Sequence, residues 1–428
     1  MTSLGKRPSA FSTAEEIVTS RARREPLRPA LGWRERMVLL GRFADIVAER
    51  AQAIAQFVRP GQAIAQVMSD TPAFVSTTFA IWRANCTAVP LDPGLPPEEI
   101  GRRLAHSEVA ALIAHEEHLE RAERASAAAE GGALVLVSRG LRLLPIGRRG
   151  ASRRASERRR PVALLDGARR RAGASGGVTG INDVAFHAYA GSADGGLRAA
   201  VLTHANVVAS ALRLSIARGD GPEDVALASH ASADVSALVG EVLSRLIVGG
   251  AVALLGPNGL RELADRIEQH RVTDVSLASD LAAQLAETSG PPRRALRSVR
   301  KLLLRDPGLP LTLKRELLDR FGRAELLQSH GSIESTDAIF TARQGTVFRK
   351  PATLGVPHPG LVVAVVDPDG RPVRPGQRGE IVCRGAVVMR GYHRRPQLTR
   401  AVLRDGWLHT GDLGYIDADG DLSLVGRR

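Results

Sequence analysis

Residues 405–428 read Asp-Gly-Trp-Leu-His-Thr-Gly-Asp-Leu-Gly-Tyr-Ile-Asp-Ala-Asp-Gly-Asp-Leu-Ser-Leu-Val-Gly-Arg-Arg. Within this stretch, residues 408–410 and 413–416 have the composition of strands, and Gly411 and Asp412 lie between them. A glycine here lets the backbone come close to a ligand. The carboxylate of Asp412 offers two acceptor oxygens, which match the two hydroxyl donors of a ribose. The stretch therefore predicts a contact to a nucleotide sugar within a β-rich part of the chain.

A hairpin is expected directly after this contact. Two short alternating runs flank Asp417-Ala-Asp-Gly420, and hairpin turns favour Gly where φ must be positive. The alternative is a calcium loop, but an EF-hand needs Gly at its sixth position and a bidentate Glu at its twelfth. Counted from Asp417, Gly420 comes too early and the twelfth position is Arg428. We therefore predict a turn and reject a calcium loop.

The composition is that of a folded globular chain. Its 428 residues are 44% hydrophobic and have a mean hydropathy of −0.07, which suits two or three packed subdomains. No apolar run reaches the ~18 to 20 residues of a membrane span, and no signal-peptide core follows the N-terminal basic residues, so we expect a cytoplasmic protein. Cys86 and Cys383 lie far apart in apolar runs, which predicts buried thiols without a metal.

The formal net charge of +14 is concentrated in one segment. Twelve arginines and two acidic residues lie from Arg139 to Arg171, so ten of the fourteen net charges belong there. Such a run could bind nucleic acid or an anionic membrane surface through its charge. Because it contains no aromatic residue to stack on bases, we favour a solvated Arg-rich insert over residues 138–180.

Helix and strand patterns alternate through most of the chain. Residues 1–30 are polar and Arg-rich, which indicates a loose lead-in. Apolar residues at helical spacing predict an amphipathic helix over residues 36–57. A buried strand follows, and then a helix capped by Asp70 or Thr71 with a proline in its first turn. Because such alternation gives parallel sheets, we expect an α/β fold with two βαβ parallel-sheet subdomains over residues 31–344.

The pattern changes after this part of the chain. Short strand-like runs separated by Pro and Gly turns fill residues 345–428, as in Gly355-Val-Pro-His-Pro-Gly360. This texture predicts a small β-barrel-like subdomain in addition to the two parallel-sheet subdomains.

Several of these stretches resemble one family. The run of residues 405–414, Val-Gly-Arg at 425–427 and Val-Pro-Leu-Asp-Pro at 89–93 are similar to motifs of the adenylate-forming superfamily. That superfamily contains acyl-CoA synthetases, fatty acyl-AMP ligases and the adenylation domains of peptide synthetases. The resemblance implies that Asp412 and Arg427 bind the ribose hydroxyls. It also implies that this chain corresponds to the N-terminal domain and lacks the mobile C-terminal domain.

A glycine-rich loop resembles the family's phosphate loop, whose hydroxyls, backbone amides and lysine hold the ATP phosphates. The residues that keep its character are Gly191, Ser192, Gly195 and Gly196. Arg198 stands where the family has lysine, and no lysine occurs between Lys6 and Lys301. Arginine preserves the charge without the compact ammonium group, so the resemblance implies phosphate binding with altered catalytic placement.

Residues 329–334, Ser-His-Gly-Ser-Ile-Glu, resemble the family motif Tyr-Gly-x-Thr-Glu. In the family the aromatic ring stacks on adenine, the threonine meets the α-phosphate and the glutamate binds magnesium. The resemblance implies that His330 and Gly331 contact the nucleotide, and that Glu334 is a metal ligand and the main catalytic residue beside Arg198. Ile333 replaces the threonine and removes one donor to the phosphate, which weakens transition-state stabilisation.

The implied activity is ATP- and Mg²⁺-dependent adenylation of a carboxylic acid, for which we expect a fatty acid. Arg198 and Ile333 predict that this activity is impaired. We expect CoA as a substrate only if a C-terminal domain is supplied, since this chain has no lysine after Lys350. The alternative is a catalytically inactive, truncated relative that acts at most as a nucleotide- or anion-binding protein.

Overall fold

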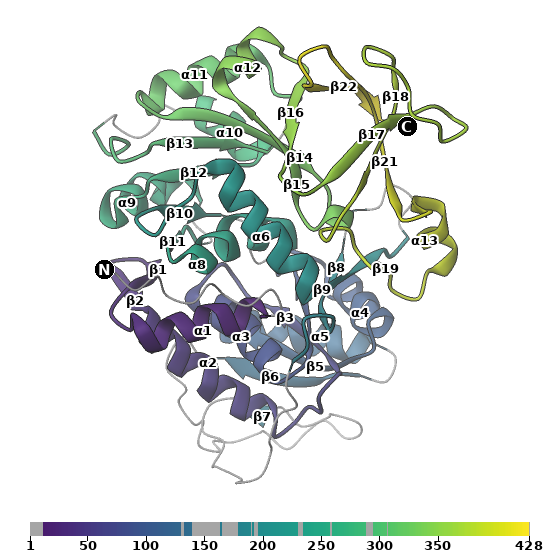
Figure 1. The fold of residues 1–428 in the computed structure, drawn as a ribbon. Coiled ribbons are helices and arrows are strands. Elements are labelled where there is room, and N and C mark those ends of the chain that lie inside the picture. Colours follow the sequence, from purple (N-terminus) through teal and green to yellow (C-terminus); the bar gives the residue numbers. More distant parts are fainter. Residues whose placement is uncertain are drawn as a thin grey trace, which may run out of the picture.

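The computed structural model describes residues 12–129, 132–138, 163–164, 179–189, 191, 196–229, 234–256, 259–287, 294–305 and 307–427. Within these residues the strands form one sheet of eight and one of fourteen. In Figure 1 the smaller sheet lies in the lower half of the molecule and the larger one crosses the upper half. The α/β prediction, with two parallel sheets and a β-rich part, is confirmed.

The smaller sheet has the order β19-β9-β8-β4-β3-β5-β6-β7 and is parallel from β8 to β7. Its antiparallel edge consists of β9 and β19. Its strands are β3 (Ala63–Val67), β4 (Thr87–Leu91), β5 (Val109–His115), β6 (Leu134–Ser138), β7 (Ala163–Leu164), β8 (Val184–Tyr189), β9 (Ala199–Thr203) and β19 (Gly391–Tyr392). The connecting helices are α3 (Pro72–Arg83), α4 (Pro97–His106), η1 (Glu116–His118) and α5 (Leu119–Ala128).

The parallel part of the larger sheet has the order β1-β11-β10-β12-β13-β14, with β2 antiparallel at its edge. Its strands are β1 (Pro29–Trp33), β2 (Arg36–Leu39), β10 (Val225–Ala228), β11 (Ala251–Leu254), β12 (Asp274–Leu277), β13 (Lys301–Leu304) and β14 (Glu325–Gly331). Its helices are α6 (His204–Arg218), α7 (Val235–Ala237), η2 (Leu238–Leu243), α8 (Ser244–Val248), α9 (Leu260–His270), α10 (Ser279–Glu287) and α11 (Leu311–Phe321).

The β-rich C-terminal part continues the larger sheet in the antiparallel order β14-β15-β16-β22-β21-β18-β17. Its elements are η3 (Ile333–Ser335), β15 (Ala338–Arg343), α12 (Gln344–Arg349), β16 (Thr353–Pro357), β17 (Val362–Val366), β18 (Gly379–Arg384), α13 (Pro396–Val402), β20 (Leu403–Arg404), β21 (Trp407–Ile416) and β22 (Leu422–Arg427). In Figure 1 it lies at the upper right, where β21 and β22 end the chain.

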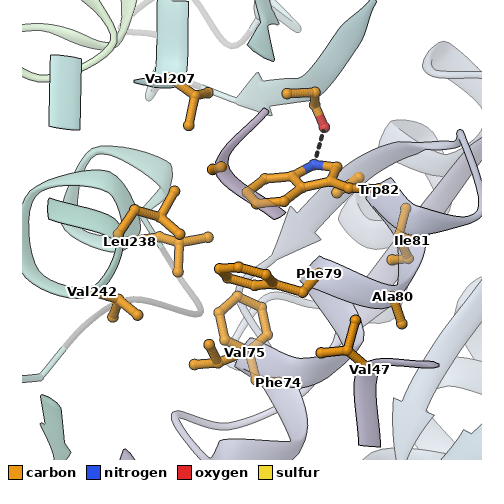
Figure 2. Packing of buried hydrophobic residues seen from close by; sticks show 14 of the residues in the cluster. Val47, Phe74, Val75, Phe79, Ala80, Ile81, Trp82, Val207, Leu238 and Val242 are labelled. Atoms are coloured by element: carbon orange, nitrogen blue, oxygen red, sulfur yellow. Dashed lines mark hydrogen bonds between the residues drawn. The ribbon is translucent and has the colours of Figure 1, made fainter. Parts of the chain in front are cut away.

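One buried apolar cluster joins the two sheets, because it contains residues of α3, α6, η2 and the two N-terminal helices, α1 (Ala14–Arg24) and α2 (Leu40–Ile54). Figure 2 shows Phe79 and Trp82 of α3 facing Leu238 and Val242 of η2. The indole Nε1 of Trp82 donates to the Ala185 carbonyl of β8 at 3.0 Å, so its polar atom is satisfied inside the core. The two sheets therefore share this cluster, and further buried clusters lie within each of them.

Two expectations about the N-terminal region are wrong. Residues 14–24, expected within a loose lead-in, form α1 (Ala14–Arg24). Its capping box joins the Thr13 hydroxyl to the Glu16 backbone and the Glu16 carboxylate to the Thr13 backbone. The helix expected over residues 36–57 is shorter, since β2 takes its first residues and α2 runs over Leu40–Ile54.

Further expectations from the sequence can be compared with the structure. Thr71 caps α3, with its hydroxyl 3.4 Å from the backbone nitrogen of Phe74. Cys86 and Cys383 are buried free thiols. Within the Arg-rich insert, β7 pairs in parallel with β6, and most of residues 138–180 lie outside the described part. No helix that the structure describes has the length and apolar character that a membrane crossing requires.

Candidate functional site

The candidate site begins at the carboxyl end of β14, where His330 and Gly331 complete the strand. His330 Nε2 lies 2.8 Å from Asp412 Oδ2, which joins β14 to β21 across 82 residues of sequence. Both side chains are largely buried, at 18% and 13% exposed. Because ligands of open α/β sheets bind outside the carboxyl ends of the parallel strands, this pair lies where a ligand is expected.

Gly331 is required by a close backbone contact. A Cβ atom at this position would lie 2.3 Å from the carbonyl oxygen of Asp337 and 2.5 Å from Cα of Ala338. Real Cβ atoms do not come that near to backbone atoms. The strand can therefore bend into the η3 turn only with glycine at position 331.

Asp412 is held by a local irregularity in β21. Gly411 has φ +76°, and its N–H donates to Glu380 Oε1 at 3.2 Å. The other carboxylate oxygen, Glu380 Oε2, lies 3.0 Å from His409 Nδ1. The Asp412 N–H donates to the Thr410 hydroxyl at 3.1 Å. These contacts hold the backbone that carries the Asp412 carboxylate, so Glu380 has a structural role here.

Arg427 lies directly across from Asp412 in the register of β21 and β22. Its Nε is 3.7 Å from Asp412 Oδ1, and 73% of its side chain is exposed. An ion pair this exposed contributes little to stability. The guanidinium group of Arg427 thus lies beside the His330–Asp412 pair and is accessible to a ligand.

Glu334 lies in the η3 turn that follows β14. Its Oε1 accepts a hydrogen bond of 2.6 Å from the Tyr392 hydroxyl, and its backbone carbonyl accepts one of 2.8 Å from the Met389 N–H. Sequence reasoning did not select Tyr392. The signal was modest, since Tyr392 is one of only three tyrosines in the chain and follows a glycine of φ +149° in a short strand-like run.

Tyr392 also links Glu334 to the two arginines that the sequence proposes as ligand contacts. Burial and the Glu334 carboxylate raise the pKa of Tyr392, and the positive charges of Arg198 and Arg427 oppose this rise. Arg198 directly precedes β9, in which Ala200 pairs with Tyr392. Both arginines therefore act electrostatically on the phenol that holds Glu334.

The structure brings together most of the predicted site residues. The members of this group are Arg198, His330, Gly331, Glu334, Asp412 and Arg427. Gly191 and Gly196 are exposed, on the loop that leads to Arg198 and β9, while Ser192 and Gly195 lie outside the described residues.

His204, by contrast, is buried against Trp82 at a ring-centroid distance of 5.4 Å, and burial lowers its pKa to about 4. The ring therefore packs in the core around Trp82.

A charged cluster that the sequence did not predict lies at the same edge of the larger sheet. We call it the Arg305 cluster, and its members are Asp234, Glu241, Arg305 and Asp337. Arg305 Nη2 donates to Asp337 Oδ1 at 3.0 Å, and Asp337 is the residue whose carbonyl approaches Gly331. Burial raises the pKa of Glu241 to about 7, against the opposing charge of Arg305. Its members lie far apart in the sequence, so no short sequence motif contains them.

The acidic hairpin turn is separate from these residues. Asp417, Asp419 and Asp421 lie close enough together to hold a metal ion, but the Lys350 ammonium contacts all three carboxylates at 2.6 to 2.7 Å. The lysine cation therefore lies among the three carboxylates and offsets part of their charge. The carboxylate that could serve a metal within the candidate site is Glu334, and Mg²⁺ commonly takes one or two protein carboxylates together with phosphates and waters.

Comparisons with known proteins identify related sequences. The family model "AMP-binding enzyme" matches residues 18–393. A feruloyl-CoA synthase from Amycolatopsis is 31% identical over 370 residues, which are 86% of this chain and 69% of the relative. A 2-succinylbenzoate–CoA ligase from Bacillus cereus is 32% identical over 245 residues, which are 56% of this chain and 49% of the relative.

Solved structures show the same fold. A benzoate CoA ligase from Burkholderia xenovorans aligns with a TM-score of 0.82 at 22% identity, over 97% of this chain and 80% of that one. The N-terminal domain of FACL13 from Mycobacterium tuberculosis aligns with a TM-score of 0.79 at 19% identity, over 97% of this chain and 100% of that domain. From the extent of the family match and the shared fold, we conclude that this chain belongs to the AMP-binding enzyme family.

Proposed function

We propose that this chain binds ATP and activates a carboxylic acid as its adenylate. The observation that carries this proposal is the junction of β14 and β21, where His330 and Asp412 are 2.8 Å apart and Arg427 stands beside them. In the proposed reaction a carboxylate oxygen attacks the α-phosphorus of ATP. The bond to the bridging oxygen breaks, and pyrophosphate leaves with its electron pair.

Each group has a role that its chemistry supports. Asp412 accepts hydrogen bonds from the ribose hydroxyls, and Arg427 contacts the same sugar or the phosphate next to it. His330 lies against the base. Arg198 and the backbone of the glycine-rich loop neutralise the phosphates, and Glu334 would hold Mg²⁺ through its carboxylate. The catalytic contribution is positioning and charge neutralisation.

We further propose that the rate of this reaction is reduced. Ile333 offers no hydroxyl to the α-phosphate, and Arg198 carries its charge on a planar group rather than a compact ammonium. We propose thioester formation with CoA only where a C-terminal domain completes the site.

The test is acid-dependent exchange of labelled pyrophosphate into ATP by the purified 428-residue chain. Fatty acids of several chain lengths represent our substrate prediction, and ferulate represents the acid in the name of one relative. Exchange that requires one of these acids and Mg²⁺ supports the proposal. Nucleotide binding without exchange, across a wider panel of acids, would favour the inactive nucleotide-binding alternative.

A further inference from the structure

A short segment connects the two halves of the candidate site. We call residues 386–393 the strap. On one side it contacts the turn that carries Glu334, since the Met389 N–H donates to the Glu334 carbonyl at 2.8 Å and the Thr336 hydroxyl donates to the Val387 carbonyl at 2.6 Å. The Tyr392 hydroxyl adds the 2.6 Å bond to the Glu334 carboxylate. Three separate bonds thus attach the strap to the end of the larger sheet.

On its other side the strap pairs with the smaller sheet. The Arg390 N–H donates to the Val201 carbonyl at 2.9 Å, and the His393 N–H donates to the Ala199 carbonyl at 2.8 Å. These carbonyls belong to β9, the strand that starts directly after Arg198. The strap therefore bridges the strand that leaves the glycine-rich loop and the turn that holds Glu334.

The first turn of α6 also forms hydrogen bonds to the strap. Asn206 Nδ2 donates to the carbonyls of Ala386 and Val388 at 2.8 and 2.9 Å. Asn206 is itself 8% exposed and forms the capping box of α6 with Thr203. The strap is consequently held by the rigid start of a helix as well as by a strand.

The position of the Tyr392 ring leaves little freedom for its hydroxyl. Only 7% of the residue is exposed, and its backbone N–H donates to the Thr399 hydroxyl at 2.9 Å. The preceding Gly391 has φ +149°, and a Cβ there would lie 2.7 Å from Cγ2 of Thr399. The phenol is therefore fixed by backbone pairing and by packing, so its hydrogen bond can orient a more exposed partner.

We propose that Tyr392 is a positioning residue for Glu334. Its hydroxyl holds Oε1 of the carboxylate, so that Oε2 is presented to the cation that accompanies the ATP phosphates. The strap then sets the distance between this carboxylate and Arg198, because it bonds both to the turn of Glu334 and to β9. This inference rests on the proposed function, and it adds a residue that acts through Glu334 without touching the reacting atoms.

The test is calorimetric titration of wild type and Tyr392→Phe with Mg²⁺-ATP and, in separate runs, with AMP without metal. Loss of a group that orients a metal ligand typically weakens metal affinity ~10- to 100-fold. We expect affinity for Mg²⁺-ATP to fall ~10-fold or more in Tyr392→Phe, while affinity for AMP stays within about twofold. Tyr189→Phe is the matched control, since its partly buried hydroxyl contacts His106, Ser107 and the Arg103 carbonyl and not Glu334.

A double-mutant cycle with Glu334→Gln separates orientation from general destabilisation. If Tyr392 acts through Glu334, adding Tyr392→Phe to Glu334→Gln changes the affinity for Mg²⁺-ATP by less than about twofold. Equal losses for AMP and Mg²⁺-ATP, or additive losses in the double variant, would overturn the inference and leave the proposed function intact. A wild type that binds neither ligand would overturn both.

Discussion

At the scale of single residues, the candidate site depends on residues whose neighbours restrict them to one conformation. Asp412 is directed by the bonds that Glu380 and Thr410 make to the Gly411–Asp412 backbone. Gly331 allows the Asp337 carbonyl to approach where any side chain would collide. The importance of these residues follows from the atoms that they contact. A substitution that changes only a few atoms can therefore test each contact.

Gly331→Ala should destabilise the protein. The added methyl group would meet backbone atoms that cannot rotate away, and overpacking of this kind costs about 1–3 kcal/mol of unfolding free energy. Urea unfolding of the purified variant measures the loss. Gly345→Ala is the control, because its nearest neighbour is the end of the Arg349 side chain at 3.8 Å and the site is helical. Equal stability of the two variants would contradict the close contact at Gly331.

Glu241 should make stability depend on pH. Its pKa is raised by burial from 4.5 to about 7, so between these values the folded protein binds one more proton than the unfolded chain. The free energy of unfolding therefore falls as pH rises through this window, by up to about 3 kcal/mol for this group. Glu241→Gln stays neutral and should lack this fall in urea unfolding measured across the window. Glu325→Gln, at an exposed carboxylate, is the control; parallel curves for wild type and Glu241→Gln would contradict the expected shift.

At the scale of elements, the β21–β22 hairpin is fastened to the helix α12 through one cation. Lys350, the residue after α12, contacts Asp417, Asp419 and Asp421 of the turn, and these hydrogen bonds raise its pKa. The three carboxylates would repel one another without it. Because β21 and β22 carry Asp412 and Arg427, the position of the hairpin bears on the site as well as on stability.

Lys350→Met should lower the melting temperature, and more strongly at low NaCl than at high NaCl. Removal of the ammonium leaves three carboxylates in mutual repulsion, and salt screens that repulsion. Thermal unfolding at the two salt concentrations measures the effect. Arg371→Met serves as the control, because Arg371 belongs to another exposed turn and pairs with Asp369 alone at 3.4 Å. A loss of stability that is independent of salt would contradict the electrostatic explanation.

At the scale of the whole molecule, local signals predicted elements well and long-range contacts poorly. The Thr71 cap and the turn at Asp417–Gly420 follow from a few neighbouring residues, and the structure contains both. The helix α1 was missed although Thr13 and Glu16 have the spacing of a capping box, because its arginines and glutamates make the segment polar and mask the apolar residues that the fold buries.

The same limit applies to the candidate site. His330, Glu334 and Asp412 stood out because each lies in a motif of adjacent residues. Tyr392 and Arg305 did not, since their partners lie 58 and 32 residues away in sequence and are brought close only by the strap and by the sheet. A motif shows which side chains carry chemistry, whereas the residues that orient them depend on tertiary packing.

The central claim is that the ends of β14 and β21 form one site for a nucleotide sugar. The most direct test is calorimetric titration with AMP and with 2′-deoxy-AMP of wild type, Asp412→Ala and Asp369→Ala, whose aspartate lies in an exposed turn and pairs with Arg371. We predict that wild type and Asp369→Ala prefer AMP. Asp412→Ala should bind AMP ~10-fold or more weakly, as expected for lost hydrogen bonds to a charged group, and should no longer distinguish the two ligands. An unchanged preference for AMP in Asp412→Ala would contradict the claim.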